Sequence, residues 1–208
     1  MLEHERDAWK AGRLFVAGVD EAGRGPLAGP VVAAAVWFDR GFAEREEKKM
    51  LAGVDDSKRL SPARREAVYE LLVNCPQARI AFSAAEVEEI SRLDILHATH
   101  AAMARALEAL DPPPDFALVD GLPVPGLPVP SRAIVKGDAK SLSIAAASIV
   151  AKVVRDRRML ELDKLYPQYG FAQHKGYGTA AHLAAIRKHG PCPAHRPTFA
   201  PVRQLTLF

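Results

Sequence analysis

Four acidic residues stand where short apolar runs end. Asp20, Glu21, Asp120 and Asp138 each lie at, or just beyond, the end of a run of strand type. Strand ends can meet at one edge of a sheet, and converging carboxylates repel one another unless a cation lies among them. That cation would be a Lys or Arg side chain, or a hard divalent ion such as Mg²⁺ or Mn²⁺. Turn and cap residues favour the same positions, so position alone leaves a metal site and a structural role both open.

A second candidate is the glycine-rich link EAGRGPLAGP at residues 21–30. Glycines allow a backbone to approach a ligand closely and to expose its N–H groups. The link matches neither the dinucleotide pattern G-x-G-x-x-G nor the phosphate-binding pattern G-x-x-x-x-G-K-[ST], so it does not predict a nucleotide cofactor. The alternative is a glycine-rich hairpin turn.

A third candidate is a polar stripe on a long apolar helix. Ser141, Ser148, Lys152 and Arg155 fall on one side of that helix at about 100° per residue. Because the helix begins close to Asp138, the stripe could face a charged site. Alternatively, Lys152 extends along an apolar surface to solvent at the edge of the helix.

The elements that would position these groups alternate along the chain. Strands are predicted at residues 13–20, 31–38, 79–84, 116–119 and 132–136, and helices at 62–74, 85–91, 95–110, 142–165 and 179–189. The short link between the first two strands favours an antiparallel pair. The order predicts an α/β fold, in which a mixed sheet starts as an antiparallel hairpin, continues with parallel strands and is flanked by helices. The proline-rich stretch LPVPGLPVP at 122–130 predicts an extended loop.

Composition limits the class of protein. The chain has 208 residues, of which 49% are hydrophobic and 25% charged, the balance of a globular domain with a core of its own. No apolar run approaches the roughly 18–20 residues that cross a bilayer, and no secretory signal is visible. Cys75 and Cys192 cannot form a disulfide framework. We therefore expect a cytoplasmic protein, and a monomer.

Charge is unevenly distributed along the chain. Residues 131–208 contain 13 Lys and Arg against 4 Asp and Glu, whereas residues 1–130 contain 15 against 21. Basic side chains gain binding free energy when they release counterions from nucleic acid. The basic C-terminal third thus favours a phosphate-bearing partner, although solvated helix faces would show the same excess.

Seven segments together resemble the motifs of one known family. They are VDEAGRGPLAGP at 19–30, DSKRL at 56–60, VDG at 119–121, KGD at 136–138, SIAAASIVAKVVRD at 143–156, HKGYGT at 174–179 and HR at 195–196. In this order, over nearly the whole chain, they resemble the type 2 ribonucleases H, the ribonuclease HII family. One departure is the uncharged proline-rich loop after Asp120, where relatives often carry polar residues. The resemblance therefore assigns no substrate contact to that loop, and its role is left open.

The resemblance implies an RNase H-like fold and a metal-dependent endonuclease. Such an enzyme hydrolyses the RNA strand of RNA/DNA hybrids and incises 5′ of single ribonucleotides embedded in duplex DNA, as in ribonucleotide excision repair. It leaves a 5′-phosphate and a 3′-hydroxyl, and uses two Mn²⁺ or Mg²⁺ ions when substrate is bound. A ribonuclease HIII is a less favoured alternative because few residues precede the first strand, and a non-catalytic hybrid-binding protein tethered to the replication clamp is another.

The resemblance also implies roles for individual residues. Asp20, Glu21, Asp120 and Asp138 match the family's acidic metal-binding and catalytic residues. Gly23-Arg24-Gly25 matches the loop that recognises the ribose 2′-hydroxyl, largely through backbone groups, and Tyr177 matches the tyrosine that stacks on the following deoxyribose. Further substrate contacts are expected from Lys58, Ser148 and Lys152.

The last five residues are a candidate docking motif. Gln204-Leu-Thr-Leu-Phe208 resembles the short segment with which bacterial replication and repair proteins bind the sliding clamp. Gln204 would anchor by hydrogen bonds, while Leu205, Leu207 and Phe208 would fill an apolar pocket. The alternative is a tail packed on its own core. We expect residues 1–200 to form one catalytic domain with a helical C-terminal part, and residues 201–208 to form a tail.

Overall fold

A single five-stranded sheet runs through the computed structural model, which describes residues 1–205. The strands are β1 (Val16–Ala22), β2 (Val31–Phe38), β3 (Ala78–Ala85), β4 (Phe116–Asp120) and β5 (Ser131–Ile134), in the order β3-β2-β1-β4-β5. β2 is antiparallel to both β1 and β3, whereas β1, β4 and β5 are parallel. The mixed sheet predicted from the sequence is therefore confirmed.

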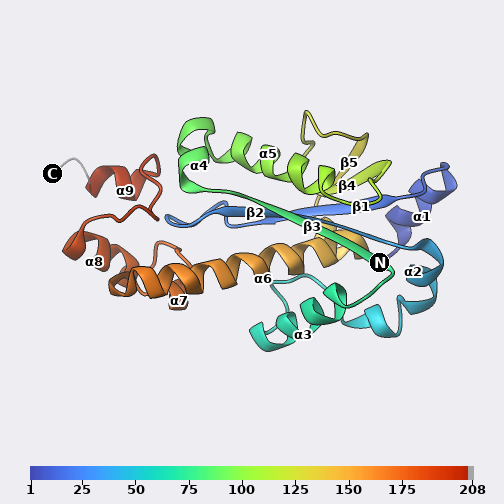
Figure 1. Ribbon diagram of the computed structural model, residues 1–208, viewed down its shortest axis with the longest axis horizontal. Helices are drawn as coiled ribbons and strands as arrows, with labels where there is room; N and C mark the ends of the chain where they lie inside the picture. The colour runs from blue at the N-terminus through green and yellow to red at the C-terminus, as the bar shows by residue number, and fades with distance from the viewer. Residues whose placement is uncertain (206–208) are drawn as a thin grey trace.

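Helices cover both faces of the sheet (Figure 1). The helices of the described residues are α1 (Glu3–Lys10), α2 (Arg40–Glu46), α3 (Pro62–Val73), α4 (Val87–Leu93), α5 (Ile95–Glu108), α6 (Leu142–Leu165), α7 (Phe171–His174), α8 (Ala180–His189) and α9 (Ala200–Leu205), with 3₁₀ turns η1 (Met50–Gly53), η2 (Gly137–Ala139) and η3 (Pro167–Tyr169). α4 and α5 lie on one face, while α6 and α3 lie on the other. No helix among the described residues is long and apolar enough to cross a membrane.

The strand β2 is apolar throughout because both of its faces are buried. Ala34 and Val36 belong to the core on the α6 side, and Ala33, Ala35 and Trp37 belong to the core on the α5 side. Successive side chains of a strand point to opposite faces. A strand covered on both faces therefore has no position where a polar side chain would meet water.

The strand β1 passes very close to the start of α6. A Cβ atom at Gly18 would lie 2.1 Å from the carbonyl carbon of Ser143 and 2.2 Å from the amide nitrogen of Ile144. Both atoms belong to backbone and cannot rotate away. Only glycine at position 18 allows α6 to begin against the middle of β1, and this contact brings Ser148 of α6 and Asp20 of β1 to the same place.

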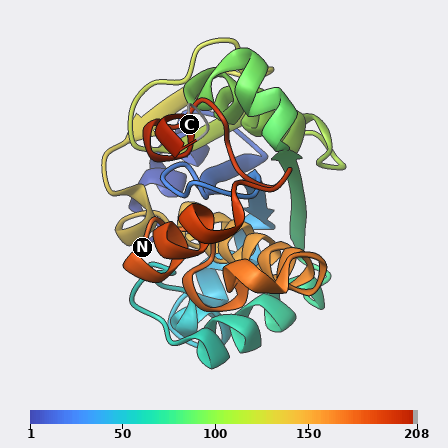
Figure 2. The same ribbon diagram turned by 90° about the vertical axis from the view of Figure 1, so that its left-hand side faces the viewer.

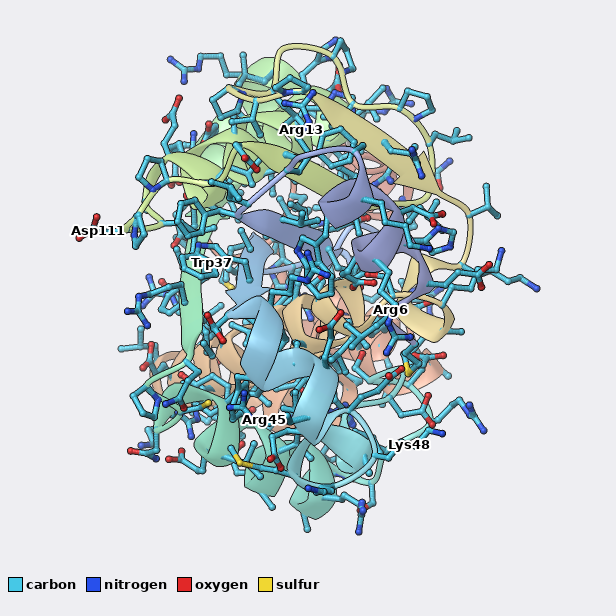
Figure 3. All side chains as sticks on the ribbon, turned by 90° about the vertical axis from the view of Figure 1, so that its right-hand side faces the viewer. Arg6, Arg13, Trp37, Arg45, Lys48 and Asp111 are labelled. Carbon is cyan, nitrogen blue, oxygen red and sulfur yellow. The ribbon has the colours of Figure 1, made fainter. Side chains whose placement is uncertain are left out.

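Two short helices that sequence analysis did not predict, α1 and α2, cover one end of the molecule. Figure 3 looks onto this end, where Arg6 of α1 is labelled, and Arg6 Nη2 pairs with Glu47 Oε2 at 2.8 Å just beyond α2. On the inner side of α1, Glu5 is buried against the first turn of α6. Its Oε1 accepts hydrogen bonds from Ser141 Oγ at 2.6 Å, and from the amide and hydroxyl of Ser143 at 2.9 and 2.7 Å. The carboxylate thus anchors the N-terminus of α6, where a negative charge is favoured by the helix dipole.

A Glu5→Ala variant should lose about 2–3 kcal/mol of unfolding free energy, because buried donors at the α6 N-terminus would lose their acceptor. Urea denaturation followed by circular dichroism measures this loss. Glu3→Ala, an exposed change on the same helix, serves as the control and should cost much less. Equal losses for the two variants would contradict the anchoring role of Glu5.

The C-terminal elements form a third small core against the far end of α6 (Figure 2). Met159 of α6, Phe171, Ile186 of α8 and Val202 of α9 are buried there together. Residues 200–205 therefore form a helix that contributes Val202 to this core, although sequence analysis placed residues 201–205 in a tail. Residues 206–208, which include Leu207 and Phe208 of the predicted docking motif, lie outside the described part of the chain.

Candidate active site

Three of the four predicted carboxylates come together. Asp20 in β1, Asp120 at the end of β4 and Asp138 in η2 offer carboxylate oxygens that all lie within 4.8 Å of one another. The parallel register pairs Val19 with Val119, so the next residues, Asp20 within β1 and Asp120 at the end of β4, lie side by side. β1 itself continues past the predicted end at Asp20 to Ala22. Asp20 and Asp138 are buried, and Asp120 is half-buried.

Backbone hydrogen bonds hold two of these carboxylates in place. Asp20 Oδ1 accepts from the amide of Glu21 at 2.7 Å, and Asp120 Oδ1 accepts from the amide of Gly137 at 2.6 Å. A Cβ at Gly137 would lie 2.6 Å from Ile144 Cδ1 and 3.3 Å from Asp120 Oδ1, so a larger residue there would displace the end of the Ile144 side chain. The turn before α6 therefore packs directly on Asp120.

The electrostatics of the cluster favour a bound cation. Burial raises the pKa of the Asp20 carboxyl well above its ordinary value of 3.8, and the charges of Glu21 and Asp120 raise it further. Burial also raises the pKa of Asp120; the Gly137 hydrogen bond opposes this rise and the charge of Asp138 adds to it. Ionised carboxylates at such a site repel one another, and a hard divalent ion with oxygen ligands relieves the repulsion.

Neutralising Asp20 should stabilise the protein when metal is absent. Because the pKa of Asp20 is raised in the folded state, its ionisation costs stability as pH rises through that pKa and costs none below the unfolded value. In EDTA at pH 7, Asp20→Asn should melt about 2–4 °C above the parent, the shift that ~1 kcal/mol produces in a domain of this size.

Calorimetry at two pH values checks this expectation. At about pH 4, near the unfolded-state pKa of an aspartate, parent and variant should melt alike. Added Mn²⁺ or Mg²⁺ should reverse the order at pH 7, because the parent gains binding free energy from the cation. If Asp20→Asn melted below the parent in EDTA at pH 7, the result would indicate that Asp20 stabilises the fold as a hydrogen-bond acceptor.

A polar segment before α3 closes the cluster on the solvent side. Lys58 Nζ donates to Asp138 Oδ2 at 3.1 Å, while its side chain remains largely exposed. Burial alone would lower the pKa of Lys58, but the hydrogen bond and charge of Asp138 outweigh it and the pKa is raised. Ser57 Oγ and Ser148 Oγ lie 2.8 Å apart, and Ser148 is close enough to Asp20 to lower the pKa of its carboxyl. The segment therefore places the positive charge of Lys58 at the solvent-exposed side of the carboxylate cluster.

The glycine-rich link and Tyr177 lie against each other. The amide of Leu27 donates to the carbonyl of Gly176 at 2.8 Å. A Cβ at Gly25 would lie 3.8 Å from Tyr177 Cε1, which is ordinary contact. The Tyr177 side chain is 49% exposed. An exposed aromatic ring beside an exposed glycine backbone is a surface on which a sugar can rest.

Comparison with known proteins assigns the family of this chain. The family model described as Ribonuclease HII matches residues 17–202, which include the three clustered carboxylates, the glycine-rich link and Tyr177. The chain belongs to the ribonuclease HII family. The resemblance that the motifs carry is thereby confirmed.

Individual relatives agree over nearly the full length. The ribonuclease HII of Geobacter sulfurreducens is 55% identical over 97% of this chain and 89% of its own. The crystal structure of the ribonuclease H2 from Pyrococcus horikoshii has a TM-score of 0.78 and 30% identity, covering 92% of this chain and 96% of that one. The ribonuclease HII in a complex with PCNA from Archaeoglobus fulgidus has a TM-score of 0.73 and 27% identity, covering 89% and 95%. As a ribonuclease HII, the protein is a metal-dependent endonuclease.

Two of the predicted site residues pair with neighbouring side chains in this structure. Glu21 stands on β1 opposite Ala33, and its Oε1 pairs with Arg24 Nη1 at 3.4 Å rather than joining the group of three. It stays close to them, however, since the charge of Asp120 contributes to its raised pKa, after burial and against the opposing charge of Arg24. Lys152 Nζ pairs with Asp156 Oδ1 at 2.7 Å on its own helix.

The polar stripe on α6 therefore serves three separate purposes. Ser148 faces Asp20, Ser141 binds Glu5, and Arg155 turns to the link, where its Nε donates to the carbonyl of Pro30 at 3.1 Å. Sequence analysis placed these residues on one side of the helix but did not assign their different partners. It also assigned no role to Arg196, which is fully buried beneath the same link.

Proposed function

We propose that this ribonuclease HII hydrolyses the RNA strand of RNA/DNA hybrids and cuts duplex DNA on the 5′ side of single embedded ribonucleotides. The observation that carries the proposal is the cluster of Asp20, Asp120 and Asp138, with a glycine backbone and the exposed ring of Tyr177 close to the same end of β1. Membership in the family supports the reaction. The adjacent loop and ring support a preference for ribose, because the 2′-hydroxyl is the local feature that distinguishes RNA from DNA.

The residues that would hold metal are Asp20, Glu21, Asp120 and Asp138. Their oxygens suit Mg²⁺ or Mn²⁺, and the raised pKa values of Asp20 and Asp120 fit a site whose carboxylates ionise fully only beside a cation. With substrate bound, two such ions would supply the charge that activates a water molecule and stabilises the leaving oxygen. Glu21, paired with Arg24, is near enough to join the other three when the substrate or a cation changes that pair.

The remaining residues bind and orient the substrate in this proposal. Gly23, Arg24 and Gly25 present backbone groups to the ribose, and Tyr177 stacks on the next deoxyribose. Lys58, largely exposed beside Asp138, approaches a backbone phosphate. Ser148 holds Asp20 in its orientation, and Lys152, paired with Asp156 in the free protein, contributes positive charge near the duplex.

The proposal is tested with defined duplexes and end-group analysis. A DNA duplex with one ribonucleotide should be cut once, leaving a 5′-phosphate on the fragment that carries the ribonucleotide and a 3′-hydroxyl on the other. The same duplex built of DNA alone should stay intact, and titration with Mg²⁺ and Mn²⁺ should give activity that EDTA removes. Cutting of the all-DNA duplex at a similar rate, or a 2′,3′-cyclic phosphate product, would contradict the proposal.

We further propose that the chain end binds a sliding clamp. Support comes from the segment Gln204–Phe208 and from the Archaeoglobus protein, which was solved in a complex with PCNA. In this proposal residues 1–200 form the catalytic domain, and the docking segment begins within α9, two residues after Val202, which packs in the third core. A pull-down with purified bacterial clamp should lose the enzyme when residues 204–208 are deleted. Equal capture of the truncated enzyme would dismiss the motif.

A further inference from the structure

Arg196 is an arginine without surface exposure that lies directly under the glycine-rich link. Its Nη2 donates to the carbonyl of Gly23 at 2.6 Å, its Nη1 to the carbonyl of Arg24 at 3.0 Å, and its Nε to the carbonyl of Gly29 at 2.9 Å. The ring of Phe199 lies 5.0 Å from the guanidinium carbon. One side chain thus binds three carbonyls of the same loop from below.

Holding a loop with a buried arginine costs free energy. Among residues 1–205 no carboxylate forms an ion pair with Arg196, and a buried charge without a counter-charge costs free energy. Burial and the nearby charge of Arg155 lower the pKa of Arg196 to about 9. Because the residue does not gain from an ion pair, its contribution lies in the geometry that it imposes on the backbone.

That geometry follows from the planarity of the peptide bond. In a trans peptide the N–H points opposite to the preceding carbonyl. The carbonyls of Gly23 and Arg24 point inward to Arg196, so the amides of Arg24 and Gly25 point outward. Within the described part of the chain, neither amide finds a hydrogen-bond acceptor, and both residues are exposed. Two adjacent free donors therefore face solvent next to Tyr177.

We propose that Arg196 is a positioning residue for ribose recognition. By holding the carbonyls of Gly23 and Arg24 inward, it presents the amides of Arg24 and Gly25 as donors to the 2′-hydroxyl oxygen of a ribonucleotide. This inference rests on the proposed function of the loop and names the residue that sets its backbone. The segment that supplies Arg196 also reaches Tyr177, because His195 Nε2 lies 3.0 Å from His182 Nε2, and His182 Nδ1 lies 2.9 Å from the Tyr177 carbonyl.

Arg196→Lys separates geometry from charge. A lysine keeps the positive charge, but its single ammonium cannot reach three carbonyls in the fork geometry of a guanidinium. The matched control is Arg155→Lys. Arg155 is also buried, and it also donates to backbone carbonyls, those of Ala28, Pro30 and Lys175. It donates to neither of the carbonyls that orient the outward amides, those of Gly23 and Arg24. Both variants should lose stability, and only the first should lose ribose recognition.

The measurement is a ratio of two dissociation constants, that of an all-DNA duplex divided by that of the same duplex with one ribonucleotide. Each variant is made in an Asp120→Asn background, in which we expect cutting to be about 10³-fold slower. It is then bound to a DNA duplex with one ribonucleotide and to the same duplex without it. Arg196→Lys should lower the ratio by about tenfold, because hydrogen bonds to the ribose are lost while phosphate contacts remain. Binding of the all-DNA duplex should stay unchanged, and Arg155→Lys should keep the parental ratio.

Several outcomes would overturn the inference. An unchanged ratio in Arg196→Lys would do so, as would an equal fall in Arg155→Lys, which would indicate general loosening of the loop. Should Arg196→Lys fail to fold, amide hydrogen exchange of the Asp120→Asn chain gives an independent answer. The amides of Arg24 and Gly25 should gain protection with the ribonucleotide duplex and not with the all-DNA duplex; equal protection would refute the inference. Failure of the parent enzyme to cut ribonucleotide-containing DNA would instead refute the proposed function.

Discussion

An Asp120→Asn variant should lose cutting of a ribonucleotide-containing duplex by about 10³-fold, equivalent to ~4 kcal/mol of transition-state stabilisation. Asp120 has a carboxylate oxygen within 4.8 Å of those of Asp20 and Asp138, and removal of its charge weakens the set of carboxylates that would hold metal. The fold should be preserved, because the amide oxygen of asparagine can still accept from the Gly137 amide. Single-turnover cleavage measures the loss, and gel-shift titration should show that the substrate still binds.

A matched control separates the site from general effects of charge. Asp7→Asn makes the same chemical change at an exposed position on α1, at the end of the molecule seen in Figure 3. It should cut at the parental rate. Full activity of Asp120→Asn, or an equal loss in both variants, would show that the three carboxylates do not form the reaction centre. A hybrid-binding protein without catalysis would show no cutting in the parent either.

A Gly18→Ala variant should be destabilised by about 3 kcal/mol or more, which lowers the melting temperature by roughly 6–12 °C. The added methyl group would overlap backbone atoms of Ser143 and Ile144, and neither can move without displacing the start of α6. That displacement moves Ser148 away from Asp20 and shifts the turn that carries Asp138. Cutting should therefore fall even at temperatures where the variant remains folded. Differential scanning calorimetry and cleavage at 20 °C measure the two effects.

Gly41→Ala provides the comparison. Gly41 lies in α2, and a Cβ there would approach only the ends of the Arg45 and Asp39 side chains, at 3.4 and 3.5 Å. Alanine in a helix is about 0.5–1 kcal/mol more favourable than glycine, so this variant should be as stable as the parent or more stable. A Gly18→Ala protein with unchanged melting temperature would mean that β1 and α6 are less tightly packed than the structure shows.

Local sequence patterns predicted most of the elements. The apolar run at 31–38 predicted a strand buried on both faces, and 142–165 predicted the long helix with the observed bounds. Sequence patterns did not predict α1 and α2. Such short helices have few apolar residues at helical spacing, and their stability comes from tertiary packing. Glu5 is an example: as an acidic residue in a charged N-terminal segment it suggests exposure, yet it is buried against α6.

The candidate site was predictable in part. Asp20, Asp120 and Asp138 could be found because each ends an apolar run, and because the sequence resembles a family whose motifs include them. The pairing of Glu21 with Arg24 and of Lys152 with Asp156 could not be found that way. Side chains with several rotatable bonds choose among neighbours that only the folded arrangement supplies. The same holds for Arg155 and Arg196, whose carbonyl partners in the glycine-rich link are more than 100 residues away.

The sequence by itself determined the family, the order of the five strands and of most helices, and the acidic residues at or near the strand ends. Each of these depends on residue type and on spacing along the chain. Tertiary structure alone decided which oxygens meet, because the register of β1 with β4 and the contact of Gly18 with α6 set distances that no local pattern contains. It also decided that a buried arginine would hold the glycine-rich loop, since hydrogen bonding requires atoms to be close in space and not in sequence.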